Sequence, residues 1–127
     1  MNVDGGARGN PGPSAIGIVV RDEAGGVLLE RGARIGDATN NVAEYKALIA
    51  GIALARDLGA DQVELIGDSE LVVKQIRGEY KVKNAGIKPL HAEAKAALAD
   101  FDGWTINHVR REMNADADRL VNNALDG

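Results

Sequence analysis

The chain of 127 residues contains no cysteine. This absence excludes disulfides, thiolate zinc sites, iron–sulfur clusters and a cysteine nucleophile, and it is typical of a reducing cytosol. No apolar run approaches the roughly 18 residues of a membrane span, and the N-terminus lacks the apolar segment of a secretory signal peptide. With 45% hydrophobic and 27% charged residues, the composition is that of a soluble globular protein, and the length predicts one domain over residues 1–127. The protein is expected to be cytoplasmic and monomeric.

An overall basic charge is also lacking. The chain has 15 basic and 19 acidic residues and a formal net charge of −4. This charge argues against a nucleic-acid partner, because proteins that bind nucleic acids usually carry a basic surface. The charge is unevenly distributed, because residues 74–88 carry +4 and the remainder carries −8. This asymmetry favours a local anion-binding edge; the alternative is a helix end and a loop that are merely solvated.

The pattern of apolar residues predicts strands first and helices later. Residues 16–20 and 27–29 flank a glycine turn at 24–26, which predicts a hairpin. Apolar spacing then predicts a helix over 41–58, a strand over 62–66, helices over 69–76 and 90–98, a strand over 104–108 and a helix over 114–125. Only residues 1–3 precede a glycine turn predicted at Asp4, so the first strand is either very short or trimmed. The order β-β-β-α-β-α-α-β-α predicts an α/β fold with a mixed sheet and helices on its faces.

Two acidic residues occupy helix positions where apolar residues are expected. Glu44 begins the stripe that continues through Leu48 and Ile52, and Asp118 lies three residues before Val121 on the inward face of the last helix. Burying an unpaired carboxylate costs several kcal/mol, so such groups are usually paired or bind a metal. The alternatives are that Glu44 neutralises its helix N-terminus and that Asp118 pairs with an arginine, either Arg119 or Arg111.

Two further acids are predicted to lie just past strand ends. Asp4 follows Val3, and Asp68 follows the strand at 62–66. In α/β sheets, ligand sites gather at the carboxyl ends of strands. Each acid has a simpler interpretation, Asp4 as a turn former and Asp68 as a helix N-cap. Taken together with Glu44 and Asp118, they favour a hard-cation site with oxygen ligands, which suits Mg²⁺ or Mn²⁺.

The glycine-rich stretch and the two histidines complete the candidate residues. Residues 4–13 match neither nucleotide-binding fingerprint, so alone they indicate a turn-rich connection. Beside a metal site, Gly5 and Gly6 would let the backbone approach a phosphate or sugar and donate N–H groups. His108, at the end of the last predicted strand, would handle protons beside a metal-bound water. His91 lies on an alanine-rich helix and is interpreted as a structural or surface residue.

Four stretches carry a resemblance to a known family. They are residues 4–12 (DGGARGNPG), 39–45 (TNNVAEY), 68–72 (DSELV), and His108 followed by 114–120 (NADADRL). With these stretches in this order, the sequence resembles the type 1 ribonuclease H family over essentially the whole chain. It looks most similar to the compact prokaryotic form, including the N-terminal domain of forms fused to a phosphatase-like domain.

The resemblance implies a ribonuclease H-like fold, a five-stranded mixed sheet with helices on both faces. It also implies an endonuclease that hydrolyses the RNA strand of RNA–DNA hybrids and leaves 5′-phosphate and 3′-hydroxyl ends. Asp4, Glu44, Asp68 and Asp118 would be catalytic and would hold two Mg²⁺ ions, with Mn²⁺ as a substitute. His108 would assist proton handling and product departure.

Substrate contacts follow from the same resemblance. Asn10, Asn40 and Asn41 would contact the minor groove, and Thr39 would grip a phosphate of the DNA strand. Gly5, Gly6 and Ser69 are expected to bind substrate as well. Lys81 and Lys83, in the one cationic stretch, are predicted to contact phosphates of the DNA strand.

Two departures from the family pattern concern the segments around the last strand. Residues 78–88 replace the extra basic helix of many members, and residues 109–113 lack the glycine-rich sequence that follows the histidine elsewhere. The first departure bears on the affinity for the hybrid, and the second bears on the mobility of His108. The alternatives to this family's activity are a catalytically silent hybrid-binding module, another nuclease or transposase of the same superfold, and a structural domain without activity.

Overall fold

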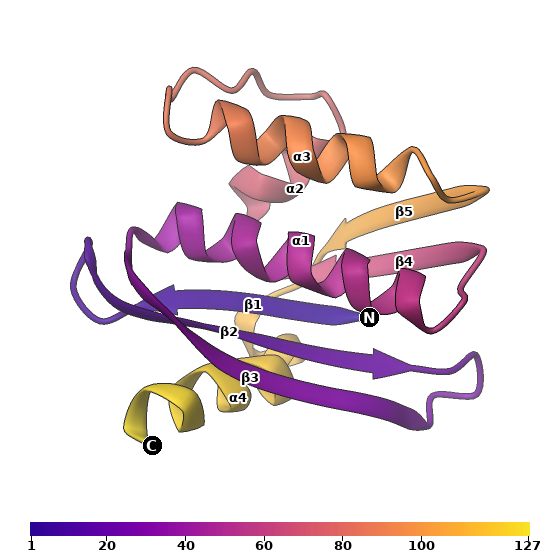
Figure 1. Ribbon diagram of the computed structural model, residues 1–127, viewed down its shortest axis with the longest axis horizontal. Helices are drawn as coiled ribbons and strands as arrows, with labels where there is room; N and C mark the ends of the chain where they lie inside the picture. Colours follow the sequence, from indigo (N-terminus) through magenta and orange to yellow (C-terminus); the bar gives the residue numbers. More distant parts are fainter.

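The elements follow one another in the order that the sequence predicts (Figure 1). The computed structural model describes all residues from Met1 to Gly127. The strands are β1 (Asn2–Ala7), β2 (Gly12–Arg21), β3 (Val27–Ala38), β4 (Gln62–Gly67) and β5 (Gly103–His108). The helices are α1 (Asn40–Asp57), α2 (Glu70–Ile76), α3 (Lys88–Leu98) and α4 (Ala115–Asp126), with the short 3₁₀ helix η1 (Arg111–Asn114) before α4.

The strands form one mixed sheet of five strands in the order β3-β2-β1-β4-β5. The first three strands pair antiparallel, whereas β4 runs parallel to both β1 and β5. The predicted hairpin of β2 and β3 is confirmed, and its turn has Gly25 at a φ of +88°. Both strands are longer than predicted, because most of β3 is an exposed edge strand without a continuous apolar pattern.

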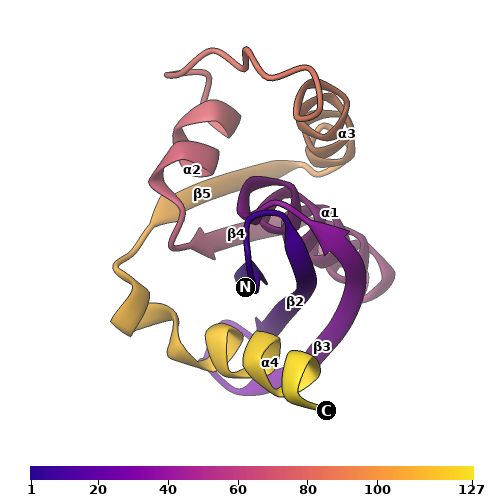
Figure 2. The same cartoon turned by 90° about the vertical axis from the view of Figure 1, so that its left-hand side faces the viewer.

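Helices cover both faces of the sheet, as predicted (Figure 2). The first three helices lie on one face and α4 lies on the other. The core on the first face is built around α1, whose Tyr45, Leu48 and Ile52 are at most 1% exposed. On the opposite face, α4 lies so close to β2 that a Cβ on Gly17 would collide with the carbonyl oxygen of Ala117. No helix of the chain has the length and apolar character needed to cross a membrane.

The predicted glycine turn at Asp4 is wrong. Residues 2–7 are a strand throughout, and Asp4 pairs with Gly17 of β2 in the middle of it. Gly5 serves close packing here: a Cβ at this position would collide with the backbone of Ala43, so its absence lets α1 lie directly on β1. The first strand is therefore neither a three-residue stub nor followed at once by a loop, and the turn begins only after Ala7.

The sheet opens between β1 and β4. The two strands pair at Asn2 and Ile66 alone, where the N–H of Ile66 donates to the carbonyl of Met1 over 2.8 Å. Beyond this pair the strands diverge, and the chain continues from β1 to one side of the sheet and from β4 to the other. Such a point, outside the carboxyl ends of two parallel strands, is where open α/β sheets form ligand crevices.

Candidate active site

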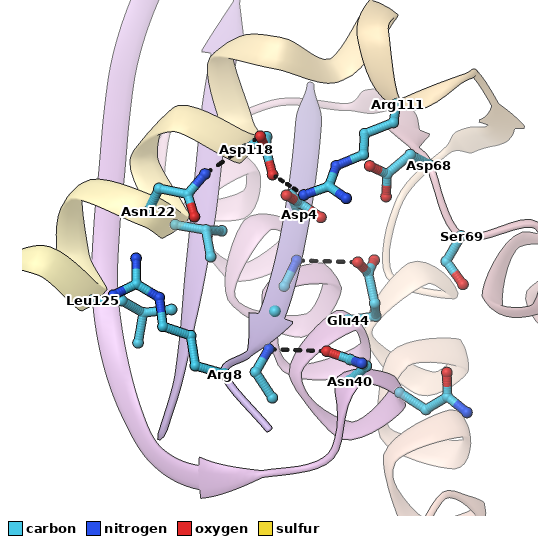
Figure 3. Close-up of a pocket in the computed structure, with 15 residues that line it drawn as sticks. Asp4, Arg8, Asn40, Glu44, Asp68, Ser69, Arg111, Asp118, Asn122 and Leu125 are labelled. Carbon is cyan, nitrogen blue, oxygen red and sulfur yellow. Dashed lines mark hydrogen bonds and ion pairs between the residues drawn. The ribbon is translucent and has the colours of Figure 1, made fainter. Parts of the chain in front are cut away.

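A hollow of about 490 Å³ lies at this opening (Figure 3). It is bordered by β1, the start of α1, the residues that follow β4, and α4. Of its 15 lining residues only three are hydrophobic. The hollow is therefore suited to a charged ligand rather than an apolar one.

The structure brings the four predicted carboxylates to this hollow from four separate elements. Asp4 lies in β1 and is only 6% exposed, and Glu44 lies in the second turn of α1. Asp68 follows β4, and Asp118 lies in the first turn of α4. Oxygens of Asp4, Glu44 and Asp68 all lie within 4.8 Å of one another. Asp118 lines the hollow from the α4 side, as Figure 3 shows.

Clustering in a buried place makes these carboxylates hard to ionise. Burial, together with the charges of Asp68 and Asp118, raises the pKa of Asp4 to about 7. Burial and the charge of Asp4 raise the pKa of Glu44 well above its usual range. Burial also raises the pKa of Asp68, although the positive charge of Arg111 opposes this effect. The cluster therefore holds more negative charge than its protein surroundings neutralise.

The simpler interpretations of these acids can now be compared with their contacts. Asp68 is not the N-cap of α2, because the hydroxyl of Ser69 accepts the capping bond from the N–H of Val72 over 3.3 Å. Glu44 does not neutralise the N-terminus of α1, because no acidic residue lies in the first turn of this helix. Its carboxylate instead accepts a hydrogen bond of 3.3 Å from the N–H of Gly5 in β1.

The pairing of Asp118 with an arginine is confirmed. Arg111 donates to it over 3.1 Å, and Asn122 donates to its other oxygen over 3.4 Å. The side chain of Arg111 reaches from η1 between Asp118 and Asp68 (Figure 3), so it is a protein cation beside the carboxylates.

The residues present fit a divalent metal ion. All the charged oxygens come from carboxylates, which are the ligands that Mg²⁺ and Mn²⁺ prefer. No histidine or sulfur ligand is among them. A divalent ion would relieve the repulsion that helps to raise the pKa values of the cluster. The arginine that pairs with Asp118, Arg111, is 75% exposed.

Asparagine and threonine side chains connect the start of α1 to the turn after β1. The side-chain oxygen of Asn40 accepts from the N–H of Ala7 over 2.9 Å, and that of Asn10 accepts from the N–H of Asn40 over 3.0 Å. Thr39 is the N-cap of α1, where its hydroxyl accepts from the N–H of Val42. Each of these contacts uses an oxygen, so the side-chain amide hydrogens of Asn10 and Asn40 stay available to a ligand.

The remaining predicted site residues lie around the hollow or away from it. Asn41, Ser69, Gly5 and Gly6 line it. His108 is exposed at the end of β5 and does not line it, although it is paired with Gly67, the neighbour of Asp68.

The lysines and the second histidine lie apart from the carboxylates. Lys81 and Lys83 are exposed between α2 and α3, and neither lines the hollow or forms an ion pair. His91 is structural, one of the two roles expected for it, because Nε2 of its ring lies 3.0 Å from the carbonyl oxygen of Gln75 and its ring lies edge-on to that of Tyr45.

Sequence reasoning missed one residue at the border of this site. Asn114 is 1% exposed and donates a hydrogen bond of 2.9 Å from Nδ2 to the carbonyl of Val3, the residue before Asp4. The signal that marked Asp118 also marks Asn114, because it lies four residues earlier on the same inward stripe. A buried asparagine there needs partners, just as a buried carboxylate does.

Comparison with known proteins assigns the family. The family model described as "Reverse transcriptase-like" matches residues 2–124. Ribonuclease HI of Halobacterium salinarum is 48% identical to this chain, in a match that covers 97% of this chain. The chain belongs to this reverse transcriptase-like family, in its type 1 ribonuclease H branch.

Solved structures of the family superpose closely on the fold. The crystal structure of RNase H1 from Halobacterium salinarum NRC-1 has a TM-score of 0.96 at 47% identity, covering 98% of this chain and 95% of that one. The structure of LC11-RNase H1 in complex with RNA/DNA hybrid has a TM-score of 0.93 at 45% identity, covering 98% of this chain and 94% of that one. The predicted ribonuclease H-like fold is confirmed.

The curated relatives are longer than this chain. The chain spans 62% of the length of the Halobacterium ribonuclease HI. The bifunctional protein Rv2228c of Mycobacterium tuberculosis is 45% identical over 99% of this chain, which spans 35% of that protein. The chain therefore corresponds to only part of each of these two longer proteins.

Proposed function

We propose that this chain is a metal-dependent endoribonuclease that hydrolyses the RNA strand of RNA–DNA hybrids, leaving 5′-phosphate and 3′-hydroxyl ends. The observation that carries the proposal is the convergence of Asp4, Glu44 and Asp68, whose oxygens lie within 4.8 Å of one another in a polar hollow. The names of the relatives support it, as does the similarity to LC11-RNase H1, which was solved with an RNA/DNA hybrid.

In this proposal, residues 1–127 are one catalytic domain and four carboxylates hold two Mg²⁺ ions, for which Mn²⁺ can substitute. The carboxylates are those of Asp4, Glu44, Asp68 and Asp118. The chemistry that such ions supply when bound is activation of the attacking water and stabilisation of the leaving oxygen. Since a single chain carries the whole set, the proposed enzyme needs no second copy and acts as a monomer. Its proposed location is the cytoplasm.

The chain's own groups would move protons and hold the substrate. His108 is exposed and pairs with Gly67, the residue before Asp68. From this place its imidazole would give a proton to a departing product. The free side-chain amide hydrogens of Asn10 and Asn40 would donate to acceptors and 2′-hydroxyls in the minor groove of the hybrid, which is how proteins distinguish RNA from DNA. The hydroxyl hydrogen of Thr39 would donate to a phosphate of the DNA strand.

Other contacts in the proposed complex depend on exposed groups around the hollow. Asn41 lines it beside Asn40 and would extend the minor-groove contact. Gly5, Gly6 and Ser69 border the carboxylates and would contact the RNA backbone. Lys81 and Lys83, which have no acidic partner, would contact phosphates of the DNA strand.

The experiment is cleavage of an RNA–DNA hybrid labelled on the RNA strand, in Mg²⁺, in Mn²⁺ and in chelator. We expect cleavage of the RNA strand only with metal, and none of a DNA duplex of the same sequence. Asp68→Asn should lower turnover by orders of magnitude at saturating metal, because it removes one of the shared ligands. Asp61→Asn, at an exposed acid outside the cluster, is the matched control and should cleave normally.

Each alternative has its own outcome in the same experiment. Hybrid binding without cleavage in any metal would identify a silent binding module. Cleavage of duplex DNA at the same rate would identify another nuclease of this superfold. Normal turnover by Asp68→Asn would refute the proposed metal ligands.

A further inference from the structure

The edge of β1 that faces the hollow lacks a strand partner. Carbonyls two residues apart on a strand point to the same side, so the carbonyls of Met1 and Val3 both face β4. That of Met1 accepts from the N–H of Ile66 in β4. That of Val3 has no partner in β4, because the strands have diverged. A buried carbonyl without a partner is costly, and another group must supply the bond.

The side chain of Asn114 supplies it. Its Nδ2 donates to the carbonyl of Val3 over 2.9 Å, and its Oδ1 accepts from the side-chain amide of Asn2 over 3.0 Å. Asn2 in turn accepts from Arg21 over 2.9 Å, and Arg21 pairs with Asp116 of α4 over 2.7 Å. No buried side-chain nitrogen or oxygen in the chain lacks a partner.

The two ends of this link are next to two different carboxylates. The carbonyl of Val3 belongs to the peptide bond that leads into Asp4. Asn114 immediately precedes α4 and lies four residues before Asp118, on the same face of the chain. A single buried amide therefore joins the strand that carries Asp4 to the helix that carries Asp118, although these acids are 114 positions apart in the sequence.

We propose that Asn114 is a positioning residue that takes the place of β4 beside β1 and fixes the spacing between the carboxylates of Asp4 and Asp118. This inference rests on the proposed metal site. Groups that orient metal ligands typically change metal affinity or activity by about 10- to 100-fold when they are removed. A residue that only stabilised the fold would not change metal affinity in the folded protein.

The experiment compares Asn114→Ala with Leu98→Ala. Leu98 is fully buried on α3, away from the hollow, so its truncation lowers the melting temperature without touching the site. Binding of Mn²⁺ alone is measured by calorimetry on folded protein below the melting temperature of each variant. We expect Asn114→Ala to bind Mn²⁺ about 10- to 100-fold more weakly than the unaltered chain. We expect Leu98→Ala to bind it normally.

Hybrid cleavage supplies a second measurement. For Asn114→Ala we expect kcat to fall at low Mg²⁺ and to recover as Mg²⁺ is raised, while KM for the hybrid stays unchanged. If Asn114→Ala does not fold, Asn2→Ala replaces it, since this variant leaves Asn114 in place and removes the bond that supports its Oδ1, together with the bond that Asn2 accepts from Arg21. It should weaken Mn²⁺ binding in the same direction and by less.

Three outcomes would overturn the inference. The first is Mn²⁺ affinity of Asn114→Ala within twofold of that of Leu98→Ala. The second applies if only Asn2→Ala folds, and is unchanged Mn²⁺ affinity in that variant. The third is an unaltered chain that binds no Mn²⁺. Failure of the proposed function is a separate result: weakened Mn²⁺ binding in Asn114→Ala, in a protein that cleaves no hybrid, would support the positioning role and contradict the nuclease.

Discussion

Replacing Asp4 with asparagine should stabilise the metal-free protein at neutral pH. Asp4 is buried, and its pKa rises from an ordinary 3.8 to about 7 in the folded chain. A raised carboxyl pKa means that the folded state holds its proton more firmly than the unfolded state does. The contribution of Asp4 to stability is therefore largest below pH 3.8 and is lost as the pH rises through about 7.

The magnitude follows from the same two values. A difference from 3.8 to about 7, at about 1.4 kcal/mol for each pH unit, corresponds to a loss of about 4 kcal/mol of unfolding free energy. Asn has the shape of Asp and no charge to desolvate. It also removes the negative charge that helps to raise the pKa of Glu44. At pH 8, the unfolding free energy of Asp4→Asn should thus exceed that of the unaltered chain by as much as about 4 kcal/mol.

The assay is urea unfolding in chelator at several pH values between 4.5 and 8.5. The unaltered chain should lose stability as the pH rises across this range. Asp4→Asn should lose less, since residue 4 no longer titrates, but it should still lose some because Glu44 and Asp68 do. Saturating Mg²⁺ should restore the stability of the unaltered chain, since the ions bind only the folded cluster. Asp61→Asn serves as the control for loss of one exposed charge. Equal pH dependence in the chain and in Asp4→Asn, or a less stable Asp4→Asn at pH 8, would refute the reasoning.

Three further variants test other parts of the chain. Arg111→Gln removes the protein cation that pairs with Asp118 and therefore competes with a metal ion for that carboxylate. Because an exposed ion pair contributes up to about 1 kcal/mol, the Mn²⁺ concentration at half-saturation, measured by calorimetry, should fall by up to about fivefold. Gly17→Ala places a Cβ against the backbone of α4, so thermal unfolding should show a loss of about 1–3 kcal/mol. Replacing Lys81 and Lys83 together by alanine should flatten the slope of log K against log salt for hybrid binding by up to about 2, while kcat stays unchanged; an unchanged slope would mean that these lysines are only solvated.

The order of the elements was predictable because each has a local signal. The helix at α1 has apolar residues at helical spacing, and the hairpin has glycines at its turn. The course of β1 was not predictable in this way. Asp4, Gly5 and Gly6 have low strand propensity, and their sequence is typical of a turn. They form a strand because β2 pairs with them along their length and α1 packs on Gly5, and both partners come later in the chain.

The site was predictable to a similar degree and for related reasons. Glu44 and Asp118 stood out as charges on apolar stripes, and the structure places both at the hollow. Asp68 was expected beyond a strand end and lies there. The reason given for Asp4 was wrong, since it lies within a strand, although its place at the hollow is as expected. Asn114 lies on the inward stripe that marked Asp118, but its partner is the carbonyl of Val3, which is left unpaired by the divergence of β1 and β4, and the sequence does not predict that divergence.

The open edge of β1 explains why these polar side chains lie together. Three of its backbone groups beyond the last pair with β4 are bonded by side chains instead. The carbonyl of Val3 accepts from Asn114, the N–H of Gly5 donates to Glu44 over 3.3 Å, and the N–H of Ala7 donates to Asn40 over 2.9 Å. A strand edge without a neighbouring strand must be satisfied by some polar group. In this chain that task is performed by a proposed metal ligand, by the residue proposed to position Asp4 and Asp118, and by a proposed substrate contact. The same bonds that complete the sheet therefore also orient the site.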